Sequence, residues 1–229
     1  MGAVDSIIPP NEQERLAALR RYDVLDTPPD GAFDRITRLA SKLLDMPISI
    51  VSLVDHDRIW FKSTAGLDGV DEIDRVPGLC ASAILSDEAW VVENAKIDPR
   101  TLANPLVAGE FGLRFYAGSP LRTHDGYNLG TLCVIDREPR TLTDEQVALL
   151  DDLASLVIDE LELRLAARRR ARQATELNDD VVQALVTARL QNEMGEHDAA
   201  SESIERALDA SKRILAEFAE DAPNFRRGE

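Results

Sequence analysis

The sequence predicts an α+β fold in which helices stand apart from one antiparallel sheet. Three observations point to this class. Short runs of β-branched and aromatic residues lie between residues 48 and 135, and polar turns connect consecutive runs. The runs do not alternate with helices as parallel βαβ units would require. Patterns of helical period occupy the two ends of the chain instead.

Two helices are expected before the first strand. Residues 1–10 end in two prolines and are expected to be a flexible N-terminus. Asn11 and Glu14 stand at the spacing of a capping box, so a helix should begin there and continue to Tyr22. The prolines at 28–29 break it, and a second helix should then run to Asp45.

The middle of the chain should supply the sheet. Alternating and β-branched runs predict strands at 48–54 and 59–63, joined as a hairpin, and at 115–121 and 129–135, joined by a turn that contains glycine. A short edge strand is expected at 90–92 and one or two helical turns at 80–85. The segment between the first hairpin and these turns is expected to be a loop.

A long helix is expected after the last strand, because Thr143 and Gln146 form a second capping-box pattern. Apolar residues then follow heptad steps, which is typical of a helix that pairs with another helix. These residues are Val147, Leu150, Ala154, Val157 and Leu161. We expect them to form the seam of a parallel homodimer with coiled-coil character. The alternative is that they pack within one chain against the helix at 11–22.

Composition narrows the class of protein. The chain has 229 residues, 44% of them hydrophobic, and a formal net charge of −16. Such acidity repels nucleic acid and anionic membranes, so neither is an expected partner. The sequence has no apolar run of the roughly 18 residues that a membrane span needs and no secretory pattern at its start. With only two cysteines, a cytoplasmic protein is expected.

Several segments of the predicted domain together carry a family resemblance. They are Glu14-Arg15-Leu16, Leu25-Asp26-Thr27-Pro28-Pro29, Phe33-Asp34, Val51-Ser52-Leu53-Val54-Asp55, Trp60-Phe61-Lys62, Asn104-Pro105-Leu106-Val107, Arg114-Phe115-Tyr116-Ala117-Gly118 and Gly130-Thr131-Leu132-Cys133-Val134-Ile135-Asp136. With these segments the chain resembles a GAF domain, of the bacterial type found upstream of histidine kinases and cyclic-di-GMP enzymes. The resemblance covers residues 11–165. It implies a six-stranded antiparallel sheet flanked by helices, a small-molecule pocket on one face, and dimerisation through the first and last helices.

The resemblance implies which residues line that pocket but not what the pocket binds. The candidates are Phe61, Cys80, Ser82, Phe115 and Tyr116, each of which could equally be an ordinary core or rim residue. The signatures of cyclic-nucleotide and bilin binding are missing from the sequence, and its histidines and cysteines do not have metal-ligand spacing. The expected ligand is therefore an unknown small molecule or a redox signal. The sequence requires no cofactor, and we expect no catalytic residues and no metal.

The two cysteines leave a second function open. Cys133 lies within an apolar strand and is expected to be a small buried hydrophobic residue. Cys80 lies where a loop meets a helix, and free amides there could stabilise a thiolate. Some GAF proteins reduce free methionine sulfoxide through pocket cysteines. A redox enzyme or thiol sensor that uses Cys80 is therefore the alternative to a non-enzymatic sensor.

The segment 176–185 resembles the phosphoacceptor helix of a sensor histidine kinase with its histidine replaced. Asn178 stands at the histidine position and Asp179 at the following acid. An amide nitrogen is not nucleophilic, because its lone pair is delocalised into the carbonyl. The resemblance implies a pseudo-histidine kinase of a two-component system, with a histidine kinase or a response regulator as possible partner. A generic packing hairpin would show the same helical period.

The C-terminal third is therefore divided into three parts. We expect a basic helical connector at 166–175, a helical hairpin that resembles a degenerate histidine-kinase dimerisation domain at 176–221, and a flexible tail at 222–229. An ATP-binding kinase domain would need roughly 100 further residues. Autokinase activity is accordingly not expected, and the predicted role is non-enzymatic signal transduction.

Overall fold

The computed structural model describes residues 8–220, without the side chains of 176–177 and 214–220. The chain divides into two compact units between Arg164 and Leu165. The two segments expected to be flexible fall wholly or mainly outside the described residues: the tail at 222–229 wholly, and the N-terminus at 1–10 for its first seven positions.

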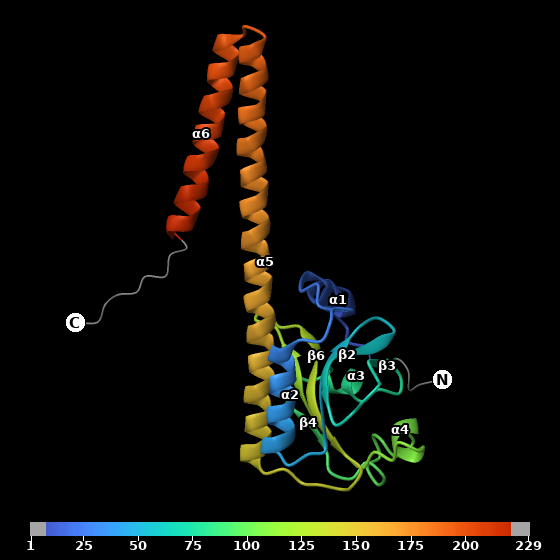
Figure 1. Cartoon of the computed structure of the whole chain (residues 1–229). Helices are drawn as coiled ribbons and strands as arrows, with labels where there is room; N and C mark the ends of the chain where they lie inside the picture. The colour runs from blue at the N-terminus through green and yellow to red at the C-terminus, as the bar shows by residue number, and fades with distance from the viewer. Residues whose placement is uncertain (1–7, 221–229) are drawn as a thin grey trace, which may run out of the picture. The chain divides into compact units, whose positions relative to one another are not determined.

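The first unit contains one six-stranded sheet in the order β3-β2-β1-β6-β5-β4, with every neighbouring pair antiparallel (Figure 1). The strands are β1 Ile48–Val54, β2 Arg58–Ala65, β3 Glu72–Asp74, β4 Trp90–Val92, β5 Phe115–Arg122 and β6 Asn128–Asp136. The predicted α+β class and antiparallel sheet are confirmed. The sequence predicts a loop where β3 forms. This strand has only three residues, two of them carboxylates, so it shows no alternation of apolar and polar residues.

The helices are α1 Glu12–Arg21, α2 Gly31–Leu43, α3 Cys80–Ala83, α4 Pro105–Ala108, α5 Asp144–Glu193 and α6 His197–Glu220. Those of the first unit lie on both faces of the sheet, whereas α6 and the end of α5 belong to the second unit. In the first unit, α2 runs beside the first half of α5 on one side of the sheet (Figure 1). On the other side, residues of α3 and α4 pack with one face of β1, β2, β5 and β6 in a common hydrophobic core.

The helix starts agree only in part with the capping patterns. Thr143 and Gln146 form the predicted reciprocal box: the Thr143 N–H donates to Gln146 Oε1 at 3.0 Å, and the Gln146 N–H donates to Thr143 Oγ1 at 3.3 Å. The box expected at Asn11 is wrong. Asn11 has φ −103° and ψ 32° and its side chain makes no cap hydrogen bond, because a capping side chain requires an extended backbone.

The expected dimer seam requires a correction. Leu150, Ala154, Val157 and Leu161 are all buried within one chain, and Val147 is half-buried. They therefore leave no apolar stripe exposed for a second chain. The reason is that this half of α5 packs within its own domain, where Tyr22 Oη donates a 2.7 Å hydrogen bond to Glu162. The heptad pattern indicated a buried helix face without specifying what buries it.

The second unit is a helical hairpin in which the end of α5 and α6 run antiparallel (Figure 1). Gly195, at the turn, has φ +80°, a conformation that glycine adopts without strain. Its buried side chains are small: Ala188, Ala200, Ser203, Ala207 and Ala210. Among the described residues, no helix is both long enough and apolar enough to cross a membrane.

Candidate functional site

The most reactive groups of the first unit meet on the α3 face of the sheet. Cys80 is the first residue of α3, and Cys133 lies on the central strand β6. Their Sγ atoms are 4.0 Å apart, both thiols are free, and their exposed fractions are 5% and 0%. Two thiols that are 53 positions apart in the sequence therefore form one buried pair.

Hydroxyl groups surround this pair. Ser52 on β1 is directly opposite Thr131 on β6, and their hydroxyl oxygens are 3.0 Å apart. Tyr116 on β5 is 1% exposed, and its Oη has no hydrogen-bond partner in the part of the chain that the structure describes. We call these five residues the cysteine cluster: Ser52, Cys80, Tyr116, Thr131 and Cys133.

The position of Tyr116 depends on a glycine. Gly118 faces the same side of β5, and a Cβ atom built on it would lie 2.3 Å from Tyr116 Oη. Only a residue without a side chain leaves room for the phenol there. The Trp90 ring on β4 packs at a tilt against Tyr116, with 5.5 Å between ring centroids. The phenol is therefore held over the sheet.

The surroundings make the two thiols unequal. The hydrogen bond from Cys133 lowers the pKa of the Cys80 thiol, burial opposes this, and the Ser52 and Thr131 hydroxyls lower it further. For Cys133 the contact with Cys80 raises the pKa, and burial raises it further, because a second thiolate beside the first is disfavoured. Burial raises the pKa of Tyr116 well above its ordinary value. Cys80 is thus the thiol that ionises first.

The structure brings together some of the pocket candidates. Phe61, Cys80 and Tyr116 belong to one hydrophobic core, and Ser82 is half-buried on α3. Phe115 is fully buried but lies outside that core, because adjacent residues of a strand point to opposite faces of a sheet. Sequence reasoning missed Ser52 and Thr131, whose hydroxyls reveal their role only once β1 and β6 are paired.

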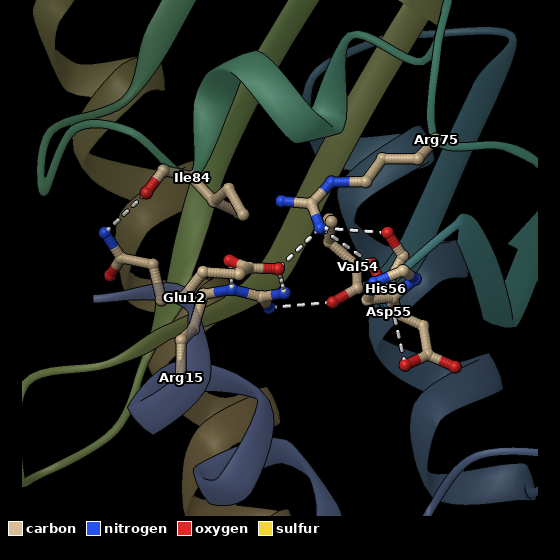
Figure 2. A network of polar contacts seen from close by, with 8 residues as sticks. Glu12, Arg15, Val54, Asp55, His56, Arg75 and Ile84 are labelled. Carbon is tan, nitrogen blue, oxygen red and sulfur yellow. Dashed lines mark hydrogen bonds and ion pairs between the residues drawn. The ribbon is translucent and has the colours of Figure 1, made fainter. Parts of the chain in front are cut away.

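A second polar group fastens α1 to the sheet and is shown in Figure 2. Arg15 is 1% exposed and donates to Glu12 at 2.7 Å and to the Val54 carbonyl at 2.7 Å. Arg75 also pairs with Glu12 and donates to the carbonyls of Asp55 and His56. We call Glu12, Arg15 and Arg75 the arginine clamp. Its groups are held in mutual ion pairs, which indicates a structural role.

The residues expected at the degenerate phosphoacceptor site lie in the second unit. Asn178 and Asp179 are both exposed on α5. Several large apolar side chains of the hairpin are exposed as well: Val182, Leu185, Val186, Leu190, Met194, Ile204 and Leu208. Among the side chains that the structure describes, the hairpin thus buries small residues between its helices and leaves these larger apolar residues at the surface.

Metal binding finds no support in the geometry. Over residues 8–220, as far as their side chains are described, no three His, Cys, Asp or Glu side chains are grouped so that they could hold a metal ion. Of the cysteine cluster, only the two sulfurs are strong ligands for a soft metal.

Comparison with known proteins identifies the first unit. The sequence profile of the GAF domain matches residues 28–161, which is more than half of the chain. The protein therefore belongs to the GAF domain family.

A curated relative is a cyclic di-GMP phosphodiesterase of Pseudomonas aeruginosa, 42% identical over 151 residues. The match covers 66% of this chain but only 26% of that relative. Among solved structures, a putative GAF sensor protein from Burkholderia vietnamiensis is 17% identical with a TM-score of 0.48, over 67% of this chain and 98% of that one. A free methionine-R-sulfoxide reductase from Neisseria meningitidis is 20% identical with a TM-score of 0.48, over 69% and 90%.

Proposed function

We propose that this protein is a non-enzymatic, cytoplasmic signalling protein, in which the GAF unit senses a small molecule or a redox signal. Membership of the GAF family supports this proposal. The curated relative also supports it, because cyclic di-GMP, named in that relative's activity, is a signalling molecule. Helix α5 supports it most directly: this single helix, Asp144–Glu193, has its first part buried within the GAF unit and forms one arm of the hairpin with its end. A change in the sensory core that rotates or shifts α5 would thus reach the hairpin.

The hairpin is proposed to pair with the hairpin of a second chain. Up to residue 213, where its side chains are described, the buried residues of α6 are alanines and Ser203, whereas Leu185, Leu190 and Ile204 are 49%, 55% and 45% exposed. Two helices cannot bury such residues by themselves, but four can. A second copy is the favoured occupant because it brings an identical apolar surface, which suits a two-fold interface.

Sedimentation of the full chain at micromolar concentration tests this pairing. We expect a dimer for the parent and a monomer for the double variant Leu185→Glu/Leu190→Glu, because each glutamate would place a charge in the interface. The matched control is Leu156→Glu/Leu163→Glu, which alters α5 leucines that are 50% and 66% exposed in the GAF unit. The control should remain a dimer. Dissociation of the control alone would place the interface on the GAF unit.

The proposal also includes a protein partner that binds the hairpin. Asn178 and Asp179 support this part because both are exposed and therefore accessible to a partner. If the hairpin descends from a phosphoacceptor domain, its surface binds a response regulator or an active histidine kinase without accepting phosphate. The ligand of the GAF unit is left open. Mass spectrometry of small molecules retained by the purified protein would identify it, and a reproducible absence of any retained or added ligand would count against small-molecule sensing.

The contact between Cys80 and Cys133 favours one alternative, a redox enzyme of the free methionine sulfoxide reductase kind. In such a reaction Cys80 would take the sulfoxide oxygen as a sulfenic acid, and Cys133 would release it as water by forming a disulfide. A turnover assay with free methionine sulfoxide and a thiol reductant decides between the functions. Turnover that disappears in Cys80→Ala would replace the sensor proposal, and we expect no turnover.

A further inference from the structure

We propose that Cys80 and Cys133 form a redox modification site, which closes to an intramolecular disulfide when a hydroperoxide reaches the α3 face. The proposal deepens the sensor function, because it names a site and an oxidant for the redox signal, and it does not depend on dimerisation or on sulfoxide turnover. It is carried by the 4.0 Å contact between the two sulfurs and by the Ser52–Thr131 hydroxyl pair, which lies on the same face of the sheet as Cys133. The chain has no other cysteine, so the pair has no competing thiol within the molecule.

The geometry allows the bond with a small movement of α3. A disulfide holds its sulfurs about 2.05 Å apart, so the two Sγ atoms must approach by about 2 Å. Cys133 is held in β6, which is hydrogen-bonded on both sides by β1 and β5. Cys80 begins a helix of only four residues. The approach therefore falls to Cys80, through its side-chain rotation and a shift of α3.

The far end of α3 has its own anchor. Asn128, 8% exposed, donates from Nδ2 to the carbonyls of Ile84 and Ser86 and to Asp87 Oδ1, at 3.1, 2.9 and 3.0 Å. Asn104 Nδ2 also donates to the Pro77 carbonyl, just before α3, at 2.7 Å, so the shift that brings Cys80 to Cys133 is confined to this short segment. Disulfide formation would tie α3 covalently to β6 and keep α3 packed over this face of the sheet.

The chemistry balances with a hydroperoxide as the only oxidant. The Cys80 thiolate attacks the peroxide oxygen: an S–O bond forms, the O–O bond breaks, and hydroxide or alkoxide leaves and is protonated. The Cys133 sulfur then attacks the sulfenic sulfur. An S–S bond forms, the S–O bond breaks, and the oxygen leaves as water with the Cys133 proton. The two thiols lose two electrons, and the peroxide gains them.

The structure assigns the order of these two steps. Cys80 begins the short α3 that covers this face of the sheet, whereas Cys133 is 0% exposed on β6, between β1 and β5, so Cys80 is the attacking sulfur and Cys133 the resolving one. Both thiols are buried, and hydrogen peroxide is comparable in size to water. It would enter when the short α3 opens locally, since short elements open at low free energy. Ser82 is half-buried, so it lies on the side of α3 that faces away from the sheet.

Intact mass spectrometry tests the proposal on the reduced full chain. The protein is treated with hydrogen peroxide, quenched, denatured and alkylated. We expect the loss of two hydrogen atoms, no alkylation, and a single cross-linked peptide pair that contains residues 80 and 133. Two alkylated cysteines, sulfinic acid without a disulfide, or an intermolecular disulfide would each overturn the proposal.

Two variants and one comparison keep the test independent of folding. In Cys133→Ala the disulfide should be lost and Cys80 should accumulate as a sulfenic acid that dimedone captures. In Cys80→Ala, Cys133 should stay reduced under the same treatment. The parent in urea should form the disulfide more slowly than the folded parent. An equal or faster rate of disulfide formation in urea would mean that the fold does not bring the two thiols together for reaction. This result would refute the proposal.

Discussion

Removing the carboxylate of Glu12 should destabilise the GAF unit strongly, because two buried guanidinium groups pair with this one carboxylate. Arg15 and Arg75 have side chains that are 1% and 6% exposed, and the Glu12 side chain is 16% exposed. Loss of one partner of a buried ion pair costs about 3–5 kcal/mol. Both arginines keep carbonyl acceptors, including Val54 O at 2.7 Å from Arg15, so we expect about 3 kcal/mol for Glu12→Ala.

Tryptophan fluorescence gives an assay that reports on this unit alone. Trp60 and Trp90 are the only two tryptophans of the chain, and both lie in the first unit. Urea unfolding followed by their emission measures the free energy of unfolding without a contribution from the hairpin. The expected loss corresponds to a fall in Tm of about 6–12 °C for a domain of this size.

The control is Glu14→Ala, an exposed glutamate in the same first turn of α1. Its effect should stay within about 0.5 kcal/mol, as for other surface substitutions. Equal losses in the two variants would show that α1 responds to helix propensity or charge and that the arginine clamp contributes nothing specific.

The difference between the parent and Glu12→Ala should also depend on pH. Burial raises the pKa of Glu12, but the hydrogen bonds from Arg15 and Arg75 bring it below its ordinary value. A carboxyl whose pKa is lower in the folded state stabilises the fold above its unfolded pKa, about 4.3. This contribution is lost as the pH falls through the folded pKa. The two proteins should therefore approach equal stability in acid, whereas a gap that widens in acid would contradict the reasoning.

Two further predictions concern a strand and the hairpin. Gly130→Ala should prevent folding of the GAF unit or cost at least about 3 kcal/mol, because its Cβ would lie 1.9 Å from the Ser52 carbonyl oxygen. Gly31→Ala, with nothing within 4 Å of its Cβ, should leave urea unfolding unchanged or raise stability by up to about 1 kcal/mol. Asn178→His should be phosphorylated by a related kinase catalytic domain supplied with ATP and magnesium, while the parent stays unlabelled. Labelling of the parent at residue 178 would contradict the resemblance to a phosphoacceptor helix.

Local patterns predicted most of the fold. Strands β1, β2, β5 and β6 follow β-branched and aromatic runs, and α5 begins at its predicted capping box. Patterns of this kind depend on neighbours in the sequence, so sequence reasoning can find them. The charged strand β3 has no such pattern, since it exists only through its pairing with β2.

The candidate site was less predictable, because its contacts join distant segments. Cys80 and Cys133 were assessed separately, one as a reactive thiol and the other as a small core residue. Their 4.0 Å contact follows from the placement of α3 over β6, which neither flanking sequence encodes. Ser52 was missed for the same reason: a serine within an apolar strand signals nothing until its partner across the sheet, Thr131, is known.

Helix α5 shows why an apolar period cannot by itself identify a dimer interface. In the GAF unit the heptad residues from Leu150 to Leu161 are buried by their own chain. In the hairpin the apolar row Val182, Val186 and Leu190 follows steps of four and is 49–55% exposed. Residues at steps of four form a ridge that fits the grooves of another helix. The apolar period of α5 thus marks a face buried within its own domain in one part of the helix and an exposed face in another, and only the burial of each residue tells the two apart. The contact between chains that we propose uses the exposed row of the hairpin.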